Sequence, residues 1–204
     1  FQRSAVMPDA SVTNEAHCIS TENSEVPVYL WKDGTILKWW SKAVKPEAQS
    51  LEYLYNDYSD LTDISGLSHW NTSKVTNMDS MFDSCNSLTG LTALSGWSTS
   101  KVTNMDSMFS DCKSLADLTA LSNWNTQRVT NMSAMFWSCR SLADLTALSS
   151  WDTSKVTNMG LMFSDCKSLT DLTALSGCDT SNVTDMGGMF CGCGNLTNLT
   201  ALSN

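Results

Sequence analysis

The chain repeats its own pattern every 27 residues. Residues 70–204 divide into five units of this length, and the same side-chain types recur at the same place in each unit. Three of these columns are Trp70, Trp97, Trp124 and Trp151, followed by Cys178; Cys85, Cys112, Cys139, Cys166 and Cys193; and Phe82, Phe109, Phe136, Phe163 and Phe190. Each unit has one apolar edge that only a neighbouring unit can cover, so the units must stack. The period therefore predicts a solenoid whose core is a set of side-chain columns.

Within one unit, the pattern predicts a short helix followed by a short strand. In residues 97–123 the apolar positions first step by three and four, as one face of a helix does: Val102, Met105, Met108, Phe109 and Cys112. Thr103 and Asp106 fit a capping box at the start of this helix. Residues 115–121 then predict a short strand or extended arc. The predicted fold class is an α/β repeat, a right-handed, leucine-rich-repeat-like solenoid of about six coils.

The chain before the regular units divides into three parts. Residues 43–69 keep the apolar columns in degraded form and carry five acidic residues, which favours an end-capping repeat. Residues 26–42 place Asp33 and Gly34 between two runs of β-branched and aromatic residues, which predicts a β-hairpin that caps the first coil. Residues 1–25 show no period and predict an irregular segment. Because residues 70–204 end on a unit boundary without a degraded repeat, we expect the natural protein to continue past Asn204.

Charge and composition exclude several classes of function. The chain has 12 Lys and Arg against 21 Asp and Glu, so no basic field is present to hold nucleic acid or an anionic membrane. No apolar run reaches the 18 residues of a membrane span. His17 and His69 lie far apart, without a Ser/His/Asp spacing, a phosphate loop or a zinc signature. We therefore expect a protein that is not an enzyme and that binds no cofactor or metal.

The cysteines favour thiols over a disulfide scaffold. Stacked coils bring the Cα atoms of the cysteine column within disulfide range, but their Cβ vectors run parallel, which opposes bond formation. The column is therefore predicted to be buried and free. Cys18, Cys178 and Cys191 lie outside the column and are the better disulfide candidates. A metal site at Cys191 and Cys193 is disfavoured, because alternate residues of an extended segment point in opposite directions and no histidine is near.

Three sets of outward-facing residues are candidates for ligand binding. A basic row consists of Lys74, Lys101, Arg128 and Lys155, and an acidic row consists of Asp117, Asp144 and Asp171. Trp137 stands where the other units have Asp83, Ser110, Ser164 and Cys191, and a lone large aromatic on such a row is typical of a binding hot spot. The alternatives are solvation of the surface for the charged rows, Ca²⁺ bridging for the acidic row and an isolated surface aromatic for Trp137.

The tryptophan column favours core packing, with an exposed aromatic strip as the alternative. A regular threonine row leaves ice or crystal-surface binding as an outside alternative.

The unit W-[ND]-T-S-x-V-T-N-M-x-x-M-F-x-x-C-x-S-L resembles the repeat of the BspA-type leucine-rich-repeat surface proteins of bacteria. Residues 70–204 match it strongly, and Tyr29–Lys42 resembles the lead-in of such arrays. Here L-T-A-L-S-x-W is one residue longer than the usual form. The resemblance implies a secreted or cell-wall-attached solenoid used in adhesion, with a host matrix, plasma or cell-surface protein as its partner. It supplies no catalytic residues.

These observations lead to two hypotheses for the function. The first is a non-enzymatic bacterial cell-surface adhesin or binding module that presents a rigid repeat face to a host or partner protein. The second is a structural spacer or stalk of a larger surface protein, with no ligand of its own. The near-identity of the units favours the spacer, because a specific binding surface needs side chains that differ from coil to coil.

Overall fold

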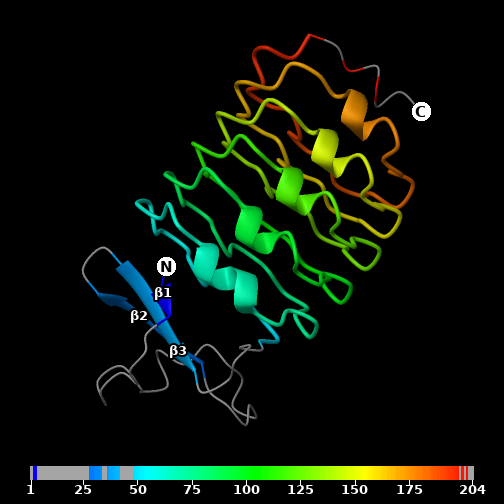
Figure 1. Ribbon diagram of the computed structural model, residues 1–204. Helices are drawn as coiled ribbons and strands as arrows, with labels where there is room; N and C mark the ends of the chain where they lie inside the picture. Colours follow the sequence, from blue (N-terminus) through cyan, green and yellow to red (C-terminus); the bar gives the residue numbers. More distant parts are fainter. Residues whose placement is uncertain are drawn as a thin grey trace.

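The computed structural model describes residues 2–3, 28–33, 36–41, 48–197, 199 and 201. Residues 48–197 form coils that stack along one axis, from cyan to red in Figure 1. Neighbouring coils are in register 27 residues apart, as shown by parallel backbone bridges from Ser50 to Asn77 and onward through Asn104, Asn131 and Asn158 to Asp185. The predicted repeat solenoid is therefore confirmed.

The N-terminal part contains a small three-stranded sheet. Strand β2 (Val28–Asp33) pairs antiparallel with β3 (Ile36–Ser41), and β1 (Gln2–Arg3) pairs parallel with β3, in the order β1-β3-β2. Both strands lie within residues 26–42, and Gly34 lies outside the described residues. Strand β1 falls in the segment that was expected to be irregular. The sheet lies beside the cyan end of the stack in Figure 1.

Short 3-10 helices replace the predicted strands. They are η2 (Ser65–His69), η3 (Thr92–Leu94), η4 (Thr119–Leu121), η5 (Thr146–Leu148) and η6 (Thr173–Leu175), and they form one column in Figure 1. In η4 the N–H of Leu121 donates to the carbonyl oxygen of Leu118 at 2.8 Å. A three-residue spacing of leucines suits this three-residue turn, because residues i and i+3 then point the same way into the core. The strand prediction for residues 115–121 was therefore wrong.

The predicted helices are also absent from the described residues, and a ladder of tight turns takes their place. In residues 105–111 alternate N–H groups donate to the next coil instead of to their own chain four residues back. Met105, Ser107, Phe109 and Asp111 donate to the carbonyl oxygens of Asn131, Ser133, Met135 and Trp137 at 2.7–3.0 Å. Ser107 and Asp111 have φ near +51° and +52°, which breaks any continuous right-handed helix. We call this element the turn ladder, formed by residues 51–57, 78–84, 105–111, 132–138, 159–165 and 186–192.

The capping box was wrong for the same reason. The hydroxyl of Thr103 donates to the carbonyl oxygen of Thr76 in the preceding coil at 3.2 Å, so it joins two coils and caps no helix. The side chain of Asp106 does not return to the backbone of Thr103; its Oδ2 atom accepts the side-chain N–H of Asn131 in the next coil at 3.1 Å. The polar residues around the turn ladder thus hold coils together.

The core consists of parallel columns, as the repeat predicted. The rings of Tyr55 and of the phenylalanine column stack nearly parallel, with centroids 5.3–5.7 Å apart. Trp70, Trp97, Trp124 and Trp151 of the tryptophan column are also buried, with 4–6% of their surface exposed. The indole N–H of Trp124 donates to the carbonyl oxygen of Leu94 at 3.2 Å, and Trp97 and Trp151 make the equivalent bond. The aromatic side chains therefore pack on their copies, and Trp97, Trp124 and Trp151 also satisfy their indole N–H across one coil boundary.

Cys178 interrupts the tryptophan column and leaves a cavity. The cavity has a volume of about 20 Å³ and is lined mainly by apolar side chains, among them Trp151, Met159, Leu175 and Met189. It has room for about one water molecule, but its apolar lining offers too few hydrogen-bond partners to hold one. The smaller side chain thus lacks both the packing and the indole hydrogen bond that Trp97, Trp124 and Trp151 provide.

The substitution Cys178→Trp should stabilise the protein. The indole should fill the cavity and donate to the carbonyl oxygen of Leu148, and we expect the free energy of unfolding to rise by about 1–2 kcal/mol. The matched control is Trp151→Cys, which should lower it by about 3–5 kcal/mol. Urea unfolding measures both changes. A Cys178→Trp protein less stable than the parent would show that the cavity cannot accept the ring.

Candidate binding surface

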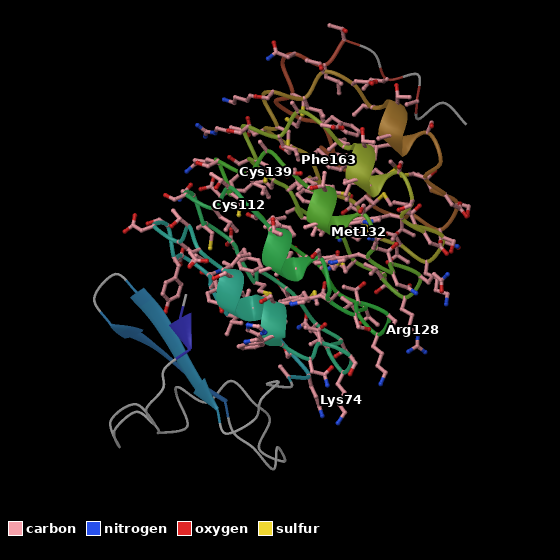
Figure 2. All side chains as sticks on the ribbon, viewed as in Figure 1. Lys74, Cys112, Arg128, Met132, Cys139 and Phe163 are labelled. Carbon is pink, nitrogen blue, oxygen red and sulfur yellow. The ribbon has the colours of Figure 1, made fainter. Side chains whose placement is uncertain are left out.

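The basic row lies along one side of the stack. Lys74, Lys101, Arg128 and Lys155 are all exposed. In Figure 2 the side chains of Lys74 and Arg128 extend away from the coils, across the stack from Cys112 and Cys139. The row therefore lies apart from Trp137, which precedes Cys139 by two residues. Because these cations recur once per coil, they form a continuous basic strip along the stack.

The acidic row has a structural role at the 3-10 helices. The Oδ1 atoms of Asp117, Asp144 and Asp171 accept the N–H of Thr119, Thr146 and Thr173 at 2.8–2.9 Å, two residues along the chain. Asp63 accepts the N–H of Ser65 in the same way at 2.8 Å. Each carboxylate thus satisfies a backbone donor at the start of η2, η4, η5 or η6, as in an Asx turn. Among the described residues, no group of three or more His, Cys, Asp or Glu side chains could hold a metal ion.

These hydrogen bonds also keep the carboxyls ionised. The backbone N–H of Thr119 holds the pKa of Asp117 below its usual value, and so does the hydroxyl of Thr119. For Asp144 and Asp171 the hydroxyls of Thr146 and Thr173 are the largest cause of a lowered pKa. The ionised carboxylates of Asp117, Asp144 and Asp171 therefore accept hydrogen bonds that stabilise the folded chain.

The triple variant Asp117→Asn, Asp144→Asn and Asp171→Asn should lose stability in a pH-dependent way. Because the folded-state pKa of each carboxyl lies below the unfolded-state value, ionisation adds stability above the unfolded-state value, about 3.9. That stability is lost as the pH falls through the folded-state pKa. The melting temperature of the variant should therefore be lower at pH 7, and the gap should close as the pH falls below about 4. A gap that stays constant from pH 7 to pH 2 would contradict the assignment.

The turn ladder exposes the large apolar residue that the sequence singled out. Trp137 has 39% of its surface exposed although its neighbours in sequence are buried. Leu161, one coil further along, is 45% exposed. Its side chain extends over Gly188 of the next coil, where an added Cβ would lie 2.8 Å from Leu161 Cδ2. Sequence analysis did not identify Leu161, yet the signal that identified Trp137 was present: its row otherwise holds Ser80, Ser107, Ala134 and Gly188.

Leu161 also has an unusual backbone conformation. Its φ of 57° lies in the left-handed region, which a bulky residue rarely occupies. The register of the turn ladder imposes this angle, because the N–H of Leu161 donates to the carbonyl oxygen of Gly187 at 2.8 Å. The chain thus holds a leucine at a strained, exposed position where the other regular units have serine, alanine or glycine and the first coil has the exposed Tyr53, with a φ of 56°.

Several positions of the turn ladder differ in character from coil to coil, and some of the small residues at these positions, such as Ser80, Ser110 and Ser164, are buried. Three rows vary in character: Asp79, Asp106, Ser133, Gly160 and Gly187; Ser80, Ser107, Ala134, Leu161 and Gly188; and Asp83, Ser110, Trp137, Ser164 and Cys191. The Thr-Ala-Leu segment of the 3-10 helices, by contrast, is identical in all five units. We call these three rows the variable face. It changes from acidic in the early coils to apolar and uncharged in the later ones.

The acidic half of the variable face is held rigidly. Asp106 Oδ1 accepts the hydroxyl of Ser107 at 2.8 Å, and Oδ2 accepts Asn131 Nδ2 of the next coil at 3.1 Å. Asp79 is held in the same way by Ser80 and Asn104. The carboxylate of Asp79 is the main reason that the pKa of Tyr53 is raised. A ligand would therefore meet charges whose positions are already set.

Comparison with known proteins identifies the repeat. A family described as "Mycoplasma protein of unknown function, DUF285" matches residues 49–146 and 117–202. The chain belongs to this family. No curated protein and no solved structure matches the chain. The two DUF285 matches together cover the stack of coils, so the variable face lies within the region that defines the family. Within the described residues, no helix is long and apolar enough to cross a membrane.

The cysteine column of the DUF285 repeat is buried and free, as predicted. The thiols of Cys112 and Cys139 donate to the carbonyl oxygens of Phe82 and Phe109 in the preceding coil at 3.1 Å. Burial raises the pKa of Cys85 and of Cys166 to about 12. The better disulfide candidates, Cys178 and Cys191, are also free thiols, half-buried and exposed respectively, whereas Cys18 lies outside the described residues.

Thiol labelling of the native protein should separate these groups. At pH 8 we expect iodoacetamide to modify Cys191 and to leave Cys85, Cys112, Cys139 and Cys166 unmodified, because those four thiols are buried and protonated. Peptide mass spectrometry gives the modified positions. In guanidinium all the cysteines should react, which controls for accessibility of the reagent. Labelling of the column in the native protein would contradict the packing described.

Proposed function

We propose that this protein is a non-enzymatic bacterial cell-surface adhesin or binding module that uses the variable face of its turn ladder. The partner is a host or partner protein of the extracellular matrix, the plasma or a cell surface. The observation that carries the proposal is the exposure of Trp137, a large aromatic side chain that one coil presents where the equivalent residues of the other regular units are polar or small. The resemblance of the repeat to BspA-type surface proteins supports the same function and a secreted or wall-attached location.

The variable face has the physical properties of a protein-binding surface. Large aromatic side chains such as Trp137 contribute much of the energy of protein interfaces, because they bury a wide area at a low cost in conformational entropy. The backbone beneath Trp137 is fixed, since its carbonyl oxygen accepts the N–H of Asp111 at 2.7 Å. A pre-organised surface loses little freedom on binding. The carboxylates of Asp79 and Asp106 would add charge complementarity and selectivity.

This proposal assigns binding to one of the three candidate surfaces. The acidic row is engaged with the 3-10 helices, and the basic row lies across the stack from the cysteine column. The carboxylates of the acidic row are thus already engaged, and the basic row lies on another side of the stack from the variable face. The basic row therefore provides control positions, because its side chains are exposed, recur once per coil and lie away from Trp137.

A structural spacer is the second candidate. The observation that favours it is the constancy of the coil-to-coil junctions, each of which repeats the same four backbone hydrogen bonds of the turn ladder. Such a stack would separate two attached domains at a set distance without any ligand. The two functions differ in what happens when the variable face is altered.

Binding to candidate host proteins should depend on Trp137. With fibronectin and fibrinogen as the immobilised probes, biolayer interferometry should show binding by the parent protein and a loss of about 30-fold in affinity for Trp137→Ser. Serine is the natural residue at the equivalent positions 110 and 164, so the fold should be retained. The control Lys101→Ser should bind within about threefold of the parent. Equal binding by parent and Trp137→Ser, or no binding of either probe at micromolar concentration, would favour the spacer.

A further inference from the structure

Three of the four charges in the basic row have no partner within the part of the chain that the structure describes. The exposed side chains of Lys101, Arg128 and Lys155 make no hydrogen bond and no ion pair there. The acidic row differs, because its carboxylates accept backbone N–H groups at the 3-10 helices. The fold therefore uses the charges of the acidic row and leaves those of the basic row available.

The backbone holds these like charges close together. The N–H of Thr103 donates to the carbonyl oxygen of Thr76 at 2.9 Å, and the N–H of Thr130 donates to Thr103 in the same way. Extended segments paired like this lie about 4.8 Å apart. Like charges that face each other across neighbouring segments repel, which lowers stability. A row of such charges without partners in the fold favours an anionic partner outside the chain.

A row of threonine hydroxyls lies beside the cations. Lys101 and Thr103 are exposed, whereas Val102 between them is fully buried, because alternate side chains of an extended segment point to opposite sides. The hydroxyl of Thr103 donates to the carbonyl oxygen of Thr76 at 3.2 Å, so its oxygen can still accept a hydrogen bond. The next two coils repeat this arrangement. The surface thus presents cations and hydroxyls in two parallel rows.

The electrostatic field along the basic row is positive although the whole chain has a net charge of −9. In physiological salt a charge acts over only about 8–10 Å, so the near surroundings decide. Within three residues of each cation, the only other charged residue is Asp152. Its Oδ1 atom accepts the hydroxyl and the N–H of Ser154 at 2.6 and 2.9 Å. An anion approaching the row from solvent therefore meets mainly positive charge.

The form of the row distinguishes between classes of polyanion. A straight row one cation wide fits a single extended chain, whereas the phosphates of a double helix wind away from such a line. Proteins bind single-stranded nucleic acids with aromatic side chains on which the bases stack. No aromatic residue occurs within three positions of any of these cations. A sulfated polysaccharide needs no aromatic surface, because it carries anionic groups and hydroxyls along one chain.

We propose that the basic row, together with the threonine hydroxyls beside it, binds a linear sulfated polysaccharide of the glycosaminoglycan class. In Figure 2 the side chains of Lys74 and Arg128 extend into the space that such a chain would occupy. Cations of successive coils would contact successive anionic groups, and the guanidinium of Arg128 would bind one sulfate through two N–H groups. The site lies on another side of the stack from the variable face and does not depend on the proposed function.

Two triple variants with the same change in charge test the proposal. The row variant consists of Lys101→Gln, Arg128→Gln and Lys155→Gln. The control variant consists of Lys113→Gln, Arg140→Gln and Lys167→Gln. The control removes the same residue types from the same three coils, but from another column, in which two of the three cations are ion-paired within their own coil.

Immobilised heparin is the probe, and biolayer interferometry measures the affinity. The parent should bind, and its affinity should fall by about 20-fold from about 50 to about 200 mM NaCl, because three or four contacts release as many counterions. At about 50 mM NaCl the row variant should bind at least about tenfold more weakly than the parent. The control variant should bind within about threefold of the parent. Free heparin should compete for binding, whereas desulfated heparin and single-stranded oligothymidine should not.

Thermal unfolding checks that the variants are comparable. Because the row variant loses like-charge repulsion and no contact of the described chain, it should melt at the temperature of the parent or above it. A lower melting temperature would show that the basic row serves the fold and would contradict the inference.

Four binding results would also overturn the proposal. The first is no binding of heparin by the parent at micromolar concentration in low salt. The second is an equal loss of affinity in the row and control variants, which would mean that only net charge matters. The third and fourth are competition by desulfated heparin and competition by oligothymidine equal to that of heparin, which would assign the row to another class of ligand.

Discussion

The hydrogen bond from one turn ladder to the next is the interaction on which the rest of the structure depends. Four such bonds at each junction set the separation of the coils. That separation allows the phenylalanine rings to stack with centroids 5.3–5.7 Å apart. It also brings the indole of Trp124 and the thiol of Cys112 within reach of carbonyl oxygens 30 residues earlier. The columns of the core are thus a consequence of backbone register.

Because these bonds use the backbone alone, they place no demand on the outward side chains between them. The ladder makes the same backbone hydrogen bonds in every coil, although its turns carry side chains as different as those of Asp79, Ser107, Trp137 and Leu161. The structure therefore separates the residues that hold the stack from those that are free to recognise a partner. The near-identity of the units at first favoured a passive spacer, but the variable face differs in character from coil to coil. This separation is what makes a binding function on the variable face physically reasonable.

Several features followed from the residues alone, and others did not. The stacking, the core columns, the buried free thiols and the exposure of Trp137 follow from a 27-residue period of apolar residues. The predicted helix at 102–112 failed because a spacing of three and four serves a row of tight turns as well as a helix. The deciding feature is the positive φ at Ser107 and Asp111, which neither residue type signals. Only the last unit has glycine at the equivalent places, Gly188 and Gly192.

The amino-acid sequence by itself determined that this chain is a stack and which side chains face its interior, because apolar periodicity depends only on what each unit must bury. Tertiary structure decided how the backbone travels around each coil and which carboxylates belong to the fold. Those properties depend on hydrogen bonds between residues 25 to 30 positions apart, such as that from Asn131 to Asp106. No local pattern contains both partners of such a bond, so their pairing emerges only when the coils come into register.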